Sequence, residues 1–313
     1  MLLETKSVIL EVAAPVLLMI AVGAFLRRIR LLNDDFILIS SRFVFKVAMP
    51  TLLFLGMLSN NLSGLISLDF ALYFASSIVL TFLFDWFLAV RLDLPYIQRG
   101  VFVQIAFRGN CGIFSLALVV NMFGQEGVAI GGIMAGLSIL LFNVLAEVIL
   151  TRYSKGHLHL VPLLKSLVKN PLILAIVLGT VANLMGLKLP LFILKTAHLV
   201  GNLSLPLALI CIGGALVTSG WALPKRFPIA LACKVIISPA LFTLVAFLFG
   251  FSQKELLFLF VFWAAPTAAS AYVTAVAKGD DGKSTANAIA TSTVFSSVVI
   301  VVCIPMIIAM TGG

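Results

Sequence analysis

Long apolar stretches recur along the whole chain, and short polar connections separate them. Each stretch has about 20 residues, enough for one helix to cross the hydrocarbon core of a bilayer. Because the apolar residues run continuously instead of alternating with polar ones, helices are favoured over a transmembrane β-barrel. The predicted spans are Val8–Phe25, Phe36–Leu55, Phe70–Val90, Gly100–Met122, Val128–Leu150, Leu172–Leu189, Phe192–Val217, Ile229–Phe249, Leu256–Ala277 and Ala286–Met310. The predicted fold class is therefore an all-α polytopic membrane protein with ten transmembrane helices.

The chain also resembles itself when it is shifted by 156 residues. Prolines and glycines then coincide: Pro15 with Pro171, Gly23 with Gly179 and Pro50 with Pro206. Internal similarity at a fixed offset indicates a duplicated unit. We expect two repeats, residues 1–156 with spans 1 to 5 and residues 157–313 with spans 6 to 10.

Composition and charge fit this organisation. Hydrophobic residues make up 62% of the chain and charged residues 11%, against about 25% charged residues in soluble domains. Lysine and arginine gather in alternate connections, so that one side carries 13 of them and the other only Lys6, Lys188 and Lys254. By the positive-inside rule the rich side is cytoplasmic, which places both termini outside the cell's inner (plasma) membrane. The net charge of +9 is therefore explained by the basic loops on the cytoplasmic side. The expected partner is the lipid bilayer and not nucleic acid.

An odd number of spans in each repeat has a further consequence. The two repeats must lie upside down relative to each other, and such inverted repeats are typical of secondary transporters.

The fourth and ninth spans are each interrupted at equivalent places. The fourth contains Gly109-Asn110-Cys111-Gly112, and the ninth contains Pro266, which coincides with Asn110 in the shifted alignment. Glycine loosens a helix, and proline removes a backbone donor and clashes with the preceding turn. Paired interruptions in inverted repeats are the best sequence indication of a substrate site. We therefore predict that helices 4 and 9 are broken and cross each other.

Such a crossing favours an anion, because the second half-helices would direct two positive N-terminal ends into one cavity. Arg108 precedes one break and Lys46 lies near the centre of the second span. Charges at this depth are costly unless paired or hydrated, which makes both functional candidates. Arg108 is assigned to charge recognition, with compensation of exposed helix carbonyls as the alternative; for Lys46 the alternative to substrate contact is a structural salt bridge. The predicted substrate-binding residues are Asn110, Pro266, Arg108, Gly109, Cys111, Gly112, Thr267, Ser270 and Lys46.

Several runs resemble the auxin efflux carrier family. They are Lys169–Ala175 at the start of the sixth span, Phe107–Asn110 in the fourth, and Ala265–Ala268 and Tyr272–Ala275 in the ninth. The resemblance covers essentially the whole chain. It implies the crossover fold that this family shares with bile-acid symporters and sodium/proton antiporters, and a homodimer. It also implies transport of auxin or of carboxylates such as malonate.

The resemblance assigns roles as well. Asn110 and Pro266 would contact or frame the substrate. Spans 1, 2, 6 and 7 would form a scaffold, and spans 3 to 5 with 8 to 10 a transport domain that moves in an elevator-like manner. The chain departs from the family where Ser115-Leu116-Ala117 replaces the common Gly-x-Pro, so the geometry of this break differs from the family pattern.

Other polar residues inside the spans are candidates for energy coupling. Asp85 and Lys234 lie at similar depth in the third and eighth spans, and Glu147 lies one helical turn beyond Asn143 in the fifth. A carboxylate at this depth can carry a proton because burial disfavours its charged form. Pairing or reaching towards the interface is the alternative. No carboxylate lies beside either break, which disfavours a dedicated sodium site.

The remaining features indicate neither an enzyme nor a metal protein. Hydrolase, metalloprotease and phosphate-loop motifs are absent, and we expect no cofactor. His157 and His159 belong to a polar linker, where solvent exposure is favoured over metal binding. Gly132 and Gly136 predict close helix packing. The predicted function is elevator-type secondary transport of a small organic anion; the alternatives are a sodium-coupled symporter of the bile-acid type and a ligand-sensing receptor.

Overall fold

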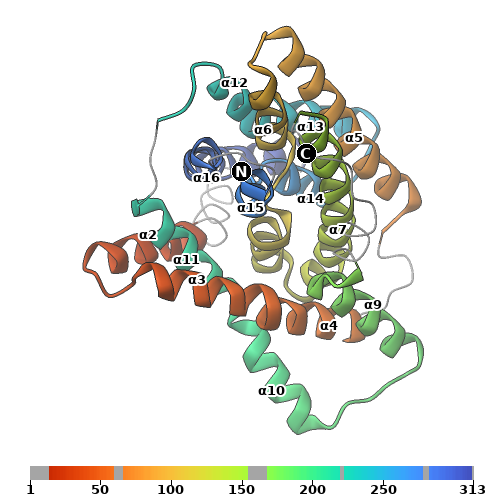
Figure 1. Cartoon of the computed structure of the whole chain (residues 1–313). Helices are drawn as coiled ribbons and strands as arrows, with labels where there is room; N and C mark the ends of the chain where they lie inside the picture. Colours follow the sequence, from red (N-terminus) through yellow and green to blue (C-terminus); the bar gives the residue numbers. More distant parts are fainter. Residues whose placement is uncertain (1–13, 60–65, 154–167, 219–221, 278–281, 312–313) are drawn as a thin grey trace.

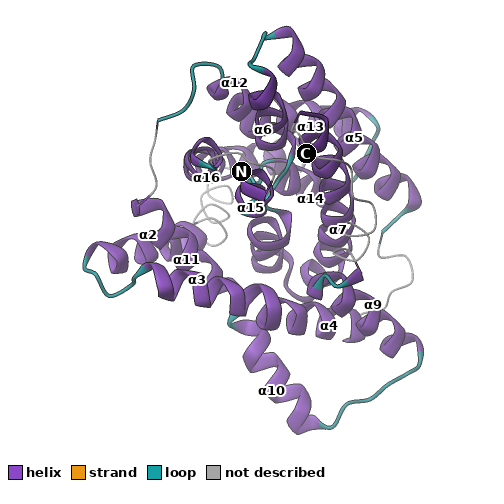
Figure 2. Ribbon diagram, viewed as in Figure 1, coloured by secondary structure: helices purple, strands orange, loops and turns teal. Residues whose placement is uncertain are grey.

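The computed structural model describes residues 14–59, 66–153, 168–218, 222–277 and 282–311. Within these ranges the chain is helical and contains no strand, apart from one isolated β-bridge (Figures 1 and 2). The boundary between the two predicted repeats and the pair of linker histidines lie outside the described residues. The all-α prediction is confirmed for the part of the chain that is described.

The helices follow one another with short connections. In the first half they are α2 (Ala14–Arg28), α3 (Asp34–Phe43), η2 (Val44–Ala48), α4 (Met49–Ser59), α5 (Leu68–Arg91), α6 (Tyr96–Phe107), η3 (Cys111–Ser115) and α7 (Leu116–Tyr153). In the second half they are α9 (Pro171–Leu184), α10 (Leu191–Asn202), α11 (Ser204–Thr218), α12 (Phe227–Ala232), η4 (Cys233–Ile237), α13 (Ser238–Leu248), α14 (Gln253–Trp263), α15 (Ser270–Ala277) and α16 (Lys283–Thr311). The η elements are single π-helical turns.

Six helical segments of the described chain are long and apolar enough to cross a membrane. They are Asp34–Ser59, Leu68–Arg91, Cys111–Tyr153, Leu191–Val217, Phe227–Leu248 and Lys283–Thr311. The difference from ten predicted spans has a local cause at several places. The predicted span Leu256–Ala277 is divided between α14 and α15, and Cys111–Tyr153 combines parts of two predicted spans across a turn at Gly124, whose φ is 56°.

Local sequence explains where helices begin and change. Asn170 caps α9 by accepting hydrogen bonds from the backbone of Leu172 and Ile173, and Pro171 stands at the first helical turn, where no donor is needed. Pro50 has no N–H for the preceding turn, and the helix widens into the π-turn η2 directly before it. The helix thus accommodates this proline with a widened turn.

The helices pack in two groups. In the first, α2 packs against α11, and α4 packs against α9 and α10. In the second, α5 packs against α6 and α7, α12 contacts α6, and α14 packs against α13 and α16. In Figure 1, α2, α3 and α11 lie together at the lower left, away from α5, α12 and α13 at the top. Helices α4, α7, α9 and α11 supply contacts between the groups.

Glycines allow these helices to approach closely. A Cβ added at Gly213 of α11 would lie 1.9 Å from the carbonyl oxygen of Ile20 in α2, and one at Gly23 would lie 2.1 Å from the carbonyl oxygen of Ile210. The predicted packing role of Gly132 and Gly136 is confirmed, because Cβ atoms there would meet Leu53 of α4 at 2.8 Å and Ile176 of α9 at 3.1 Å.

Gly213→Ala is expected to destabilise the protein by at least about 1–3 kcal/mol, because the new methyl group meets backbone that cannot move aside. The matched control is Gly214→Ala, whose Cβ would meet only the end of the Ile37 side chain at 3.0 Å. Thermal unfolding of the detergent-solubilised protein measures both variants. Equal melting temperatures for the two would contradict the packing of α2 against α11.

Candidate functional site

Two helices are interrupted and joined at their breaks. Helix α6 ends at Phe107, before η3 begins, and α14 ends at Trp263, before α15 begins. The extended residues between them form an antiparallel bridge between Gly109 and Thr267. Asn110 N–H donates to the carbonyl of Pro266 at 2.8 Å, and Ala268 N–H donates to the carbonyl of Arg108 at 3.0 Å. Each break thus supplies the backbone partners that the other lacks.

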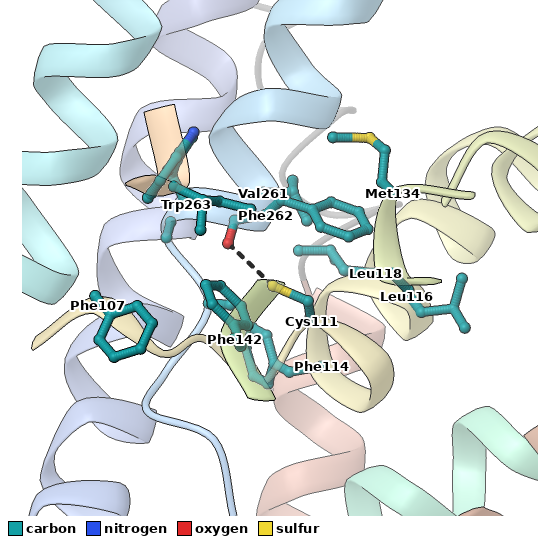
Figure 3. Close-up of a cluster of buried hydrophobic side chains, with 14 of the residues drawn as sticks. Phe107, Cys111, Phe114, Leu116, Leu118, Met134, Phe142, Val261, Phe262 and Trp263 are labelled. Carbon is teal, nitrogen blue, oxygen red and sulfur yellow. Dashed lines mark hydrogen bonds between the residues drawn. The ribbon is translucent and has the colours of Figure 1, made fainter. Parts of the chain in front are cut away.

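Side chains reinforce this junction on both sides. Thr267 Oγ1 donates to the carbonyl of Ile105 at 3.0 Å, and Gln104 Nε2 donates to the carbonyl of Ala271 at 2.9 Å. Beyond the bridge, Ser115 Oγ donates to the carbonyl of Val261 at 3.1 Å. Cys111 Sγ approaches the carbonyl of Phe262 at 3.6 Å within a cluster of buried aromatic and aliphatic side chains (Figure 3). The two interrupted helices are therefore bonded to each other over several turns.

Lys234 of η4 lies directly behind the junction and is fully buried. Its Nζ donates to the carbonyl of Trp263 at 3.0 Å, at the last residue of α14. A cation is favourable there because the C-terminus of a helix carries partial negative charge. A Cβ on Gly109 would lie 3.1 Å from the same nitrogen, so glycine at this position leaves room for the ammonium group beside the bridge.

Asp85 of α5 is also fully buried. Neither of its carboxylate oxygens has a hydrogen-bond partner among the described residues, and the hydroxyl of Thr81, one turn earlier, has none either. Asp85 and Lys234 form no ion pair within 4.0 Å. The two predicted coupling residues thus share the interior of the second helix group without direct contact.

Arg108 carries a third buried charge, and its partners are neutral. Its Nη1 donates to Gln104 Oε1 at 3.2 Å and to Thr274 Oγ1 at 3.3 Å, and its Nη2 donates to Asn143 Oδ1 at 2.6 Å. None of the ion pairs among the described residues includes Arg108. Glu147, one turn beyond Asn143, is half-buried and accepts a hydrogen bond from Thr151 Oγ1 at 3.2 Å.

A cavity of about 160 Å³ adjoins the junction. Asn110 and Ala269 contribute to its wall from the two breaks. The other walls come from α3 and η2, from η3, from α11 and from α16; their residues are Ile37, Ser41, Val44, Ile113, Ala208, Cys211, Ile212, Ala215, Leu216, Ile289, Ala290 and Thr293. The lining is mostly apolar, and Asn110 is the polar side chain that the junction places in it.

The structure brings most of the predicted site residues together. Asn110 lines the cavity, while the buried Pro266 and Thr267, together with Gly109, build the bridge. Ser270 is exposed at the first residue of α15, next to the cavity residue Ala269.

Two predicted residues lie elsewhere. Gly112 faces Leu172 of α9, whose Cδ1 would lie 3.2 Å from an added Cβ. Lys46 is exposed on η2 and does not line the cavity.

Sequence reasoning missed one polar residue of the site, Gln104. Gln104 was not singled out, although a fully buried amide one turn before Arg108 is a recognisable signal. Ser292 belongs to a polar stripe of the tenth predicted span, and its Oγ reaches the junction by accepting a hydrogen bond from the N–H of Thr267 at 3.0 Å. Among the described residues no group of three or more histidine, cysteine or carboxylate side chains has the geometry of a metal site.

Comparison with known proteins places the chain among membrane transporters. Residues 8–304 match the model of a family described as membrane transport protein. The chain is also 27% identical over 311 residues to an uncharacterized transporter from Methanocaldococcus jannaschii, an alignment that covers 93% of this chain and 96% of that protein.

Lys234→Met is expected to lower the free energy of unfolding by at least about 1–3 kcal/mol, because the buried carbonyl of Trp263 loses its donor. The loss is larger if the buried Lys234 charge also compensates the carboxylate of Asp85. Adding Asp85→Asn is expected to restore part of that loss, since it removes the uncompensated carboxylate. Thermal unfolding of wild type, both single variants and the double variant gives the coupling between the two groups. Additive effects within about 0.5 kcal/mol would show that the two charges do not compensate each other.

Proposed function

Because the chain belongs to the membrane transport protein family of the auxin efflux carrier type, we propose that it is a secondary transporter of a small organic anion, either auxin-like or a mono- or dicarboxylate such as malonate. The observation that carries the proposal is the junction of the two interrupted helices, with Asn110 in the wall of an adjoining cavity. Irregular backbone at membrane depth is tolerated only where protein or a cavity surrounds it. Here it has both.

Several groups at the junction suit a carboxylate. The half-helices that begin at Cys111 and Ser270 place partial positive charge near the bridge. Asn110 supplies an amide that can donate to the anion, and Arg108 supplies the full positive charge. Pro266, Gly109 and the other bridge residues keep these groups in position.

The proposed architecture is a ten-helix inverted repeat in which α6–η3 crosses α14–α15. The pairs α2–α11 and α4–α9 fit the proposed scaffold of spans 1, 2, 6 and 7, and the second helix group fits the transport domain. The cavity lies between α3 and α11 on one side and the junction with α16 on the other. Since the junction is bonded over several turns, it moves as one body, which favours an elevator-type displacement. We further propose that both termini lie outside the inner membrane and that the protein forms a homodimer.

We assign the coupling of anion transport to a proton to residues of the second helix group. The unpartnered carboxylate of Asp85 is the proposed proton carrier, with Glu147 and Asn143 nearer the end of α7. Lys234 already provides a cation at the C-terminal end of α14, which favours transport without sodium over the bile-acid type of coupling.

Asn110→Ala is expected to reduce counterflow of labelled anion in proteoliposomes at least tenfold, because the cavity loses its amide. A thermal-shift screen of mono- and dicarboxylates, at two pH values and with or without sodium, first selects the anion. The matched control is Asn202→Ala, at an exposed position at the end of α10. Normal counterflow by Asn110→Ala would contradict the site, and binding without any counterflow by the wild type would favour a receptor.

Asp85→Asn is expected to abolish the stimulation of uptake by an inward proton gradient, because an amide cannot take up the proton. Uptake by wild type and variant is compared with and without the gradient. The variant should retain counterflow at equal pH on both sides. If the variant kept the full response to the gradient, Asp85 would not be the proton carrier.

A further inference from the structure

The buried charges of the described residues do not balance. Three charged side chains are buried there, Asp85, Arg108 and Lys234, and all three belong to the second helix group. Asp85 and Lys234, when both are ionised, cancel. Arg108 is then left as one net positive charge inside a membrane protein.

Among the described residues, none of the hydrogen-bond partners of Arg108 carries a negative charge. Gln104, Asn143 and Thr274 contribute amide and hydroxyl oxygens that orient the guanidinium but carry no net charge. The nearest carboxylate along α7 is Glu147, which is half-buried and forms no ion pair with Arg108 within 4.0 Å. A buried charge without a counter-charge is strongly unfavourable. The site is therefore built to receive one negative charge.

We infer that Arg108 is the counter-charge of the transported anion, so that, while Asp85 and Lys234 are both ionised, the loaded transport domain crosses the membrane without net charge and the empty domain returns with a charge of +1. A proton on Asp85 adds one charge to either state, so the charge movement is measured at the same alkaline pH on both sides of the membrane. This inference rests on the proposed transport function. Arg108 does not line the cavity, but Asn110, two residues along the same extended segment, does. In a low-dielectric interior a charge acts on an anion without direct contact.

Two properties follow from this arrangement. The transported species is a monoanion, because a dianion would leave the loaded domain with an uncompensated negative charge. Membrane potential acts on the return of the empty domain and not on the movement of the loaded one. Moving one charge across the whole field at 100 mV changes an equilibrium by a factor of about 50, and a step with a symmetrical barrier changes its rate up to about sevenfold.

The experiment compares counterflow with net uptake in proteoliposomes whose potential is clamped at 0 and −100 mV with potassium and valinomycin. Labelled indole-3-acetate serves as the monoanion and malonate as the dianion. Counterflow involves only loaded domains, so the wild type should exchange indole-3-acetate at rates that differ by less than twofold between the two potentials. Net uptake requires the empty return and should change several-fold. Voltage-dependent counterflow by the wild type would overturn the inference.

Variants at Arg108 separate its charge from its shape. Arg108→Gln leaves the loaded domain with the charge of the anion, so its counterflow should become voltage-dependent by up to about sevenfold. Arg108→Lys retains the charge, so its counterflow should stay voltage-independent even where the loss of the guanidinium contacts lowers its rate. Arg42→Gln is the control, because Arg42 is an exposed guanidinium on α3, outside the moving helices.

The outcomes are distinguishable. A folded Arg108→Gln variant with voltage-independent counterflow would overturn the inference, and if that variant does not fold, the two wild-type measurements decide. Malonate is a dianion at a pH where both of its carboxyl groups are ionised. If its counterflow at that pH were voltage-independent and faster than that of indole-3-acetate, the inference would also be overturned. Absence of counterflow by the wild type for every anion in the screen would instead contradict the proposed transport function.

Discussion

The short antiparallel bridge between Gly109 and Thr267 is the contact on which the rest of the structure depends. An interrupted helix leaves backbone groups without partners, and within a bilayer no water replaces them. Two interruptions placed against each other solve this problem, because Asn110 donates to Pro266 and Ala268 donates to Arg108. Either break alone would be costly. Together they give a stable region of extended backbone inside a helical protein.

This arrangement explains the polar groups that surround the junction. Lys234 meets the carbonyl end of α14, and the hydroxyl of Thr267 meets a carbonyl of α6. These contacts hold the two helices as one body while leaving Asn110 at the wall of a mostly apolar cavity. In the proposed function, the same residues that satisfy the backbone also form the place where the anion meets helix ends and an amide. In this proposal the same contacts at the junction stabilise the fold and position the groups that bind the anion.

The sequence predicted the helical segments, because apolar stretches of membrane length are a strong signal. It also located both interruptions, since glycine and proline act through the local backbone at Gly109 and Pro266. Contacts between distant segments could not be predicted from the sequence. The exposure of Lys46 depends on which face of η2 turns outward, and the separation of Asp85 from Lys234 depends on how α5 and η4 pack. Gln104 could have been noticed as an amide inside an apolar stretch, but its partners Ala271 and Thr274 are known only when the other helix is placed.

An experimental structure with the transported anion bound tests the central claim most directly. The account predicts that the anion occupies the cavity beside Asn110 and Ala269, with its carboxylate towards the bridge and its body against α11. It would be contradicted if the anion occupied another place, such as the apolar groove between α13, α14 and α16 that is lined by Leu244, Phe260 and Met306.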